Sequence, residues 1–201
     1  MIIFMSDIVC VTASKLCSKD FFEQLDRIAK AKPKFIILRE KDVSEEDYTA
    51  LAEKAANICQ DKTEMVLHFY WKSAINLGKD SIHLPLYIFR MLNDADKSHF
   101  RRIGVSCHSV EDAVEAQNLG ASYITAGHIF ATDCKKGLAP RGVGFLRDIC
   151  ISVDIPVYAI GGISPDNIDL VRECGVAGAC VMSGFMRCED PSEFISEFDR
   201  K

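Results

Sequence analysis

Short runs of mainly apolar residues alternate along the chain with segments of helical spacing. The runs lie at 8–12, 35–39, 65–69, 81–84, 103–107, 123–127, 157–161 and 179–183. Helical spacing is found at 20–31, 44–59, 109–120, 143–153, 164–175 and 191–198. Apolar strands separated by helices are typical of a parallel sheet covered on both faces. Eight such units predict one α/β domain over residues 1–201, a single closed (β/α)8 TIM barrel. An open doubly wound sheet is the alternative.

The residues at the ends of the helical segments support this alternation. Ser44, Ser109 and Ser164 stand where helices should begin, and Gly120 and Gly175 stand just past two helix ends. Between residues 71 and 101 the helical signals are short, and reduced or irregular helices are expected there.

Composition and charge narrow the class of protein. The chain has 48% hydrophobic residues and a net charge of -5, without the basic excess that a nucleic-acid-binding protein normally carries. The opening residues lack the basic region of a signal peptide, and no apolar run is long enough to cross a membrane. Nine cysteines without a CxxC pair fit a reduced, cytoplasmic protein.

A phosphate site is predicted at the last two strands. TIM-barrel sites lie at the carboxyl ends of the strands, and the loops after strands 7 and 8 often hold phosphate. Here these loops contain Gly161 and Gly162, then Ser183 and Gly184. Backbone amides and a helix N-terminus at this point would bind an anion. The other interpretation is that the glycines only form tight turns.

The densest polar stretch at any strand end is GHIFATDCKKG, at 127–137. His128 is the candidate general acid/base, because imidazole exchanges protons near neutral pH. A satisfied structural histidine is the other interpretation. Thr132 and Lys135 are candidate substrate-binding residues, and Lys135 with Lys136 would form a basic lid or a solvated surface pair.

Two other strand ends carry polar side chains. Arg39 and Lys41 follow the second strand and are candidates to hold a phosphate or carboxylate. Ser109 follows the fifth strand and is a further substrate-binding candidate. Its neighbours Cys107 and His108 cannot pair as nucleophile and base, since adjacent strand residues point to opposite faces.

A family resemblance rests on motifs found in order from the second strand to the eighth, which are LREK, GVSCHSVEDAVEAQNLGASYITAGHIF, TDCKKG, IPVYAIGGISPDN and VMSG. Together they resemble the thiamine phosphate synthase and TenI superfamily of single (β/α)8 barrels. The resemblance implies one of two activities. A synthase joins a pyrimidine diphosphate to a thiazole phosphate with Mg. A TenI-type thiazole tautomerase isomerises a carboxythiazole phosphate by proton transfer.

The sequence departs from the synthase pattern at the Mg carboxylates. Synthases carry Asn-Asp after the third strand and an acidic residue after the fourth, where this chain has His68-Phe69 and Ile88. Mg requires oxygen ligands, which these side chains lack. Glu40 and Asp133 are the only carboxylates expected near the mouth. The Gly-His pair resembles the TenI type, in which this histidine, His128 here, is the proposed proton shuttle.

Three functions follow as hypotheses. The leading one is a thiazole tautomerase that uses no metal or other cofactor, with a small phosphorylated thiazole as its ligand. The second is a thiamine phosphate synthase with a remodelled metal site. The third is a non-catalytic thiazole phosphate sensor, whose pocket would be made apolar by the aromatic residues of the segment 69–71 and Tyr87, unless these residues only pack under short helices. The family resemblance also implies a homodimer.

Overall fold

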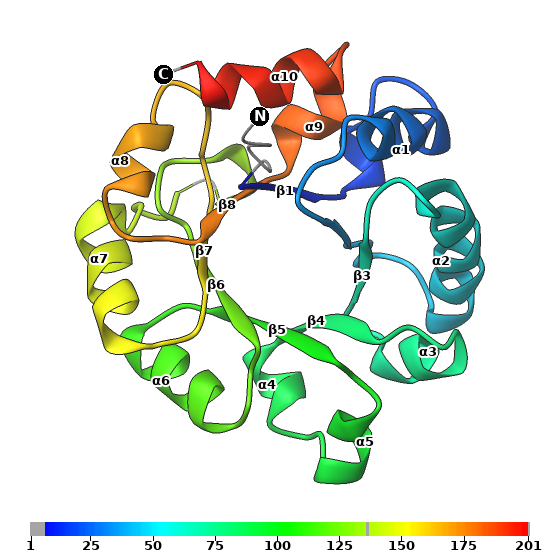
Figure 1. The fold of residues 1–201 in the computed structure, drawn as a ribbon, viewed down its shortest axis with the longest axis horizontal. Helices are drawn as coiled ribbons and strands as arrows, with labels where there is room; N and C mark the ends of the chain where they lie inside the picture. Colours follow the sequence, from blue (N-terminus) through cyan, green and yellow to red (C-terminus); the bar gives the residue numbers. More distant parts are fainter. Residues whose placement is uncertain (1–6, 136, 201) are drawn as a thin grey trace, which may run out of the picture.

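The computed structural model describes residues 7–135 and 137–200 and shows a closed parallel barrel ringed by helices (Figure 1). The strands follow chain order around the barrel, which confirms the TIM barrel and removes the open sheet. They are β1 (Ile8–Val11), β2 (Ile36–Leu38), β3 (Met65–His68), β4 (Ser81–Pro85), β5 (Arg102–Cys107), β6 (Tyr123–Gly127), β7 (Val157–Ile160) and β8 (Gly178–Val181).

Long helices cover most of the barrel, and short ones stand where the sequence predicts them. The helices are α1 (Phe21–Lys30), α2 (Glu45–Cys59), α3 (Trp71–Asn76), α4 (Leu86–Phe89), α5 (Asp94–Ser98), α6 (Val110–Asn118), α7 (Gly142–Ser152), α8 (Ile168–Arg172), α9 (Ser183–Arg187) and α10 (Pro191–Asp199), with the 3-10 turns η1 (Ser14–Leu16) and η2 (Asp133–Lys135). Among these, α3, α4 and α5 are the reduced helices expected between residues 71 and 101. None of the described helices is both long and apolar enough to span a membrane.

Two of the three predicted serine caps are confirmed. The hydroxyls of Ser44 and Ser109 accept hydrogen bonds from Asp47 N–H and Asp112 N–H, at the starts of α2 and α6. The prediction for Ser164 is wrong. Its own N–H donates to Asn167 Oδ1 at 3.0 Å, and α8 begins only after that residue.

The barrel interior is packed with rings at the amino end of the strands. Phe35, Tyr123 and Tyr158 meet edge to face with centroids 5.5 Å apart. Gly104 makes room for this packing, because a Cβ there would lie 2.1 Å from Tyr123 Cζ. Because every second residue of a strand points inward, the inward residues nearer the carboxyl ends occupy the other half of the barrel interior.

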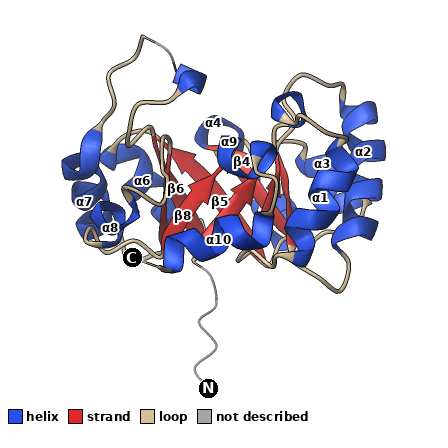
Figure 2. Ribbon diagram, turned by 90° about the horizontal axis from the view of Figure 1, so that it is seen from above, coloured by secondary structure: helices blue, strands red, loops and turns tan. Residues whose placement is uncertain are grey.

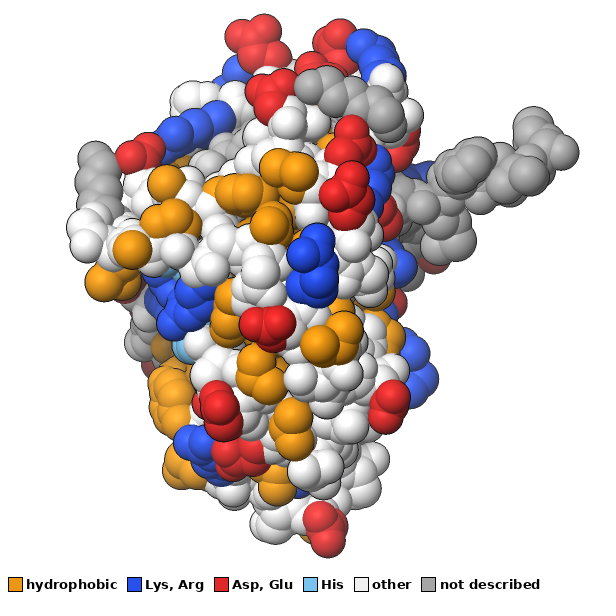
Figure 3. All heavy atoms as spheres, turned by 90° about the vertical axis from the view of Figure 1, so that its left-hand side faces the viewer, with side chains coloured by type: hydrophobic (Ala, Val, Ile, Leu, Met, Phe, Trp, Pro, Cys, Tyr) orange, Lys and Arg blue, Asp and Glu red, His pale blue; other side chains and the backbone are white. Residues whose placement is uncertain are grey.

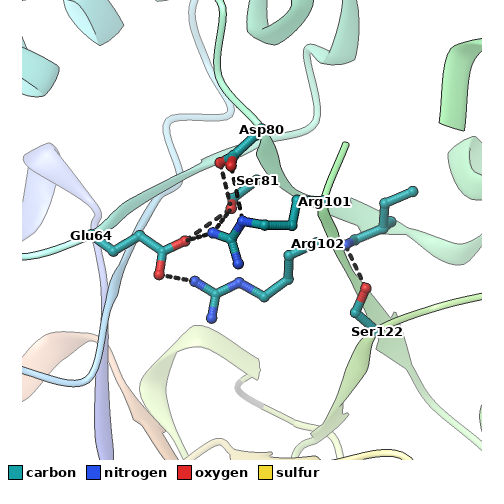
Figure 4. Close-up of polar contacts among 7 residues, drawn as sticks. Glu64, Asp80, Ser81, Arg101, Arg102 and Ser122 are labelled. Atoms are coloured by element: carbon teal, nitrogen blue, oxygen red, sulfur yellow. Dashed lines mark hydrogen bonds and ion pairs between the residues drawn. The ribbon is translucent and has the colours of Figure 1, made fainter. Parts of the chain in front are cut away.

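A polar cluster lies at the same amino end (Figure 4). Glu64 pairs with Arg101 and Arg102, and Arg101 Nε donates to Asp80 at 2.9 Å. These residues precede or begin β3, β4 and β5, so their ion pairs tie neighbouring strands where they start. This end is closed, and the opposite end carries the site.

The outer face over α7 and α8 has scattered hydrophobic side chains among charged ones (Figure 3). The exposed large apolar residues on these helices are Ile151 and Leu170. Scattered apolar side chains are ordinary on a soluble surface. The homodimer implied by the resemblance therefore stays a prediction.

Candidate active site

A cavity of about 690 Å³ opens at the carboxyl ends of the strands. Its wall contains side chains or backbone from all eight strand ends, and Thr132 and Lys135 of the loop after β6. That loop rises from the same end of the barrel (Figure 2). The structure brings together at this cavity most of the predicted site residues, namely Arg39, Lys41, His128, Thr132, Lys135, Gly161, Gly162 and Ser183.

His128 lies immediately after β6 in a left-handed conformation, with φ of 65°. Its N–H donates to Ile160 O at 2.9 Å, and its carbonyl accepts from Arg141 N–H at 2.9 Å. These two bonds hold a backbone conformation that is uncommon for a residue with a Cβ. The strained turn directs the chain from the strand into the loop 128–141.

The His128 imidazole is buried at the cavity wall, with 3% of the residue exposed. Its Nε2 has no hydrogen-bond partner among the described residues. Desolvation lowers the pKa of His128 below its ordinary value, and the nearby charges of Lys135 and Arg141 lower it further. At neutral pH the side chain is therefore an uncharged imidazole that is able to accept a proton.

The loop after β7 supplies Gly161 and Gly162, with φ of 107° and 67°. A Cβ on Gly162 would lie 2.4 Å from Ala131 O, so glycine is required for the packing of the loop 128–132 as well as for the turn. Because α8 starts at Ile168, no helix N-terminus follows these glycines directly. The anion site expected here would thus consist of turn amides.

The other two predicted phosphate residues, Ser183 and Gly184, follow β8 and have different surroundings. Ser183 is the first residue of α9 and lines the cavity, whereas the sequence places it at the end of a strand. Gly184 faces α10, where a Cβ would lie 2.4 Å from Phe194 Cζ. Gly184 is therefore needed for the packing of α9 on α10. It is absent from the residues that line the cavity.

Positive side chains surround the mouth of the cavity. Burial lowers the pKa of Lys41, and the charges of Arg39 and Lys135 lower it further. The pKa of Lys135 is lowered by burial and by Arg141. Like charges held this close are relieved by an anion between them, so the mouth is suited to a negatively charged ligand. Lys136 lies outside the described residues.

The end of β5 places its three candidates differently. Cys107 points away from the cavity into the outer core, which is the hydrophobic layer between the barrel and its helices. Burial there raises the pKa of the thiol to about 12. Both observations agree with the rejection of Cys107 as a nucleophile. His108 lines the cavity. Ser109 uses its hydroxyl to accept from Asp112 N–H at 3.0 Å, so it caps α6 and is absent from the cavity wall.

Several cavity residues are not among the sequence candidates. His68, His83, Ser106 and Thr125 form a polar floor inside the barrel, and Arg90 and Asp112 stand on the wall. The two-residue alternation of strands was the available signal, since it places 68, 83, 106 and 125 on the inner face. Asp112 also corrects the expectation that Glu40 and Asp133 are the only carboxylates near the mouth.

The aromatic residues divide between the two interpretations. Phe69 and Tyr87 line the cavity. Tyr70 instead donates to Val43 O at 2.6 Å and packs on Tyr48, and Trp71 packs against the outer core. One pair thus makes the pocket apolar, and the other supports short helices.

The residues present do not fit the Mg site of the synthases. Phe69 is on the cavity wall, Ile88 lies on α4 outside it, and His68 offers a nitrogen where an oxygen is needed. Glu40 uses both carboxylate oxygens to accept from Thr12 and Ser14. Within 7–135 and 137–200, no three His, Cys, Asp or Glu side chains gather as a metal site would need.

The fold and the site define a TIM-barrel protein with a cation-rimmed cavity at its carboxyl face. The family model described as thiamine monophosphate synthase matches residues 8–185, and the chain belongs to this thiamine phosphate synthase and TenI superfamily.

Sequences and solved structures similar to the chain include thiamine-phosphate synthases. The thiamine-phosphate synthase of Fusobacterium nucleatum is 33% identical over 190 residues, which cover 91% of this chain and 90% of the relative. That of Clostridium acetobutylicum is 33% identical over 180 residues, covering 87% and 83%. The solved thiamine phosphate pyrophosphorylase from Pyrococcus furiosus has a TM-score of 0.81 at 26% identity, covering 98% of this chain and 95% of that one. These names favour the synthase over the tautomerase.

Proposed function

We propose that this protein acts on a small phosphorylated thiazole by proton transfer through His128, as a thiazole tautomerase. The observation that carries the proposal is the buried His128 imidazole, whose Nε2 is without a partner among the described residues at a cavity rimmed by cations. The absence of the Mg carboxylates from their expected positions supports the same choice. The family membership suggests a phosphorylated thiazole as the ligand, and the His128 side chain suggests proton transfer as the reaction.

The proposed reaction needs only residues of this chain. The phosphate would bind amides at Gly161 and Gly162 and the hydroxyl of Ser183, and the ring would then lie in the cavity near His128. The lone pair of Nε2 takes a proton from one carbon of the ligand, and the resulting imidazolium returns a proton to another carbon of the ligand. The double bonds of the ring shift in between, and no atom is lost or gained overall.

Replacing His128 tests this role directly. General acid/base assistance is worth about two to four orders of magnitude in rate, so His128→Ala should lower turnover of carboxythiazole phosphate by that factor. The dissociation constant for thiazole phosphate should change little, because the phosphate is held elsewhere. Single-turnover kinetics and calorimetry on the same variant measure the two quantities. Full activity in His128→Ala would remove His128 from the mechanism.

The second candidate is a thiamine phosphate synthase, and the names of the relatives favour it. It would require another arrangement for a Mg-bound diphosphate, with Asp112 as the carboxylate on the cavity wall. Asp112 Oδ2 already accepts from His108 N–H at 2.9 Å, which orients it toward the backbone. A condensation assay with both phosphorylated halves and Mg distinguishes the candidates.

A further inference from the structure

His68 occupies the carboxyl end of β3, which stands three strands from β6 around the barrel (Figure 1), and it lines the cavity. Its backbone is fixed firmly. The His68 N–H donates to Tyr48 Oη at 2.8 Å, and Tyr48 in turn donates to Leu38 O at 2.8 Å. Phe69 then turns the chain away with φ of 72°. The position of the imidazole is therefore set by β2, β3 and α2 together.

The ring of His68 is stacked on a second imidazole. His68 and His83 are paired in register on β3 and β4, and their rings are 5.9 Å apart with planes 14° from parallel. The two histidines differ in their bonds. His83 Nδ1 lies 3.0 Å from Tyr123 Oη, and its Nε2 lies 2.9 Å from Ser106 Oγ. His83 is thus fully engaged and serves as a rigid support.

The imidazole of His68 has no such hydrogen bonds among the described residues, although only 4% of the residue is exposed. It faces the cavity beside the cations Arg39 and Lys41. Burial lowers its pKa well below the ordinary value, and the neighbouring His83, Arg39 and Lys41 lower it further. A neutral imidazole has one N–H donor and one nitrogen acceptor. His68 lines the cavity, where a ligand is able to partner both groups.

We propose that His68 is a ligand-binding residue, which presents its imidazole to the heterocyclic ring of the ligand from the end of β3, while His128 stands at the end of β6. The inference rests on the proposed function, since it assigns the ring of that ligand to His68 and its phosphate to β7 and β8. The wall formed by His68 and Phe69 presents two rings whose planes are 20° from parallel. It is suited to a planar heteroaromatic ring and unsuited to a metal-bound diphosphate.

Two probes separate ring recognition from phosphate recognition. Thiazole phosphate and inorganic phosphate are each titrated against the parent protein, His68→Leu and His68→Asn. Leucine removes both nitrogens at similar volume, whereas asparagine keeps a donor and an acceptor. Loss of a neutral hydrogen bond should weaken thiazole phosphate binding about three- to tenfold in His68→Leu, with inorganic phosphate unchanged. His68→Asn should recover part of the loss, and His99→Leu, at an exposed site, should match the parent.

A measurement on the parent protein covers the case in which His68→Leu fails to fold. The imidazole resonances of His68, assigned from their absence in His68→Asn, should shift on adding thiazole phosphate and stay in place with inorganic phosphate. Unmoved resonances, or equal affinity of His68→Leu and the parent for both probes, would overturn the inference while leaving the proposed function intact. A parent that binds neither probe would overturn both.

Discussion

The pKa of His128 is set by its neighbours, so the pH dependence of the reaction should report on them. In the proposed reaction the neutral imidazole acts as the base, and desolvation, Lys135 and Arg141 all lower its pKa. Activity should therefore persist below pH 6.5, the ordinary value, and fall only as the pH passes the lowered pKa.

Removing the charge of Lys135 tests this assignment. Lys135→Gln takes away a positive charge that disfavours the imidazolium, so the acid limb of the kcat/KM profile should move to higher pH. Lys72→Gln, outside the cavity wall, is the control and should leave the limb in place. A limb that moves to lower pH in Lys135→Gln would contradict the electrostatic account.

Ser183 gives a cleaner test of the phosphate site than the glycines do. Ser183→Ala removes one hydrogen bond to a charged group, which costs about 1.5 to 3 kcal/mol, or roughly one to two orders of magnitude in affinity for thiazole phosphate. Ser152→Ala on the exposed face of α7 is the matched control. Equal affinities in the two variants, measured by calorimetry, would place the phosphate elsewhere.

Gly162→Val is harder to interpret than the sequence suggests. The new side chain would meet Ala131 O before it met any ligand, so the loop 128–132 would have to move. Lost binding in this variant would report on the loop and on the phosphate together.

At the scale of elements, Glu40 ties the loop after β1 to the end of β2. Its carboxylate accepts from Thr12 Oγ1 at 2.8 Å and from Ser14 Oγ at 2.7 Å, and 8% of the residue is exposed. Glu40→Ala leaves these donors without their acceptor, so the free energy of unfolding should drop by about 1 to 3 kcal/mol.

The neighbouring carboxylate is the natural comparison for Glu40. Asp42 pairs with Lys15 on the surface, where its side chain is 67% exposed and solvent weakens the pair. In urea unfolding, Asp42→Ala should change stability much less than Glu40→Ala. The reverse order would show that the tie at Glu40 contributes little.

The strands are predictable from the sequence because burial on both faces leaves an apolar run that ends within a residue or two of the real strand. Helix starts are less secure. Ser164 has the spacing of a helix cap, yet its N–H donates to the side chain of Asn167, and α8 begins only after Asn167. Likewise Ser183 begins α9, because the chain turns at Met182 with ψ of -71°.

The site is predictable in part for a related reason. His128 and the glycines stand in loops after strands, where polar residues interrupt an apolar pattern. His68 and His83 lie within apolar strands, and their meeting depends on the register of β3 against β4. Ser109 and Gly184 follow strands as site residues do. In the structure, Ser109 caps α6 and Gly184 packs against α10.

For the whole molecule, the barrel combines an aromatic and ionic amino end with a carboxyl end whose cavity has a polar floor, aromatic residues on its wall and a positive rim. The rim suits a phosphorylated ligand, and the two imidazoles of His68 and His128 in the cavity lining suit its ring. Neither feature needs the Mg carboxylates that the synthase pattern carries. We therefore propose that this cavity carries out proton transfer without metal.

The most direct test measures both reactions on one preparation. Isomerisation of carboxythiazole phosphate and formation of thiamine phosphate are followed in parallel, with Mg and with excess chelator. We expect isomerisation at the same rate in both conditions and no thiamine phosphate at high protein concentration. Mg-dependent formation of thiamine phosphate without isomerisation would contradict this expectation, and tight binding of thiazole phosphate without either reaction would identify a sensor.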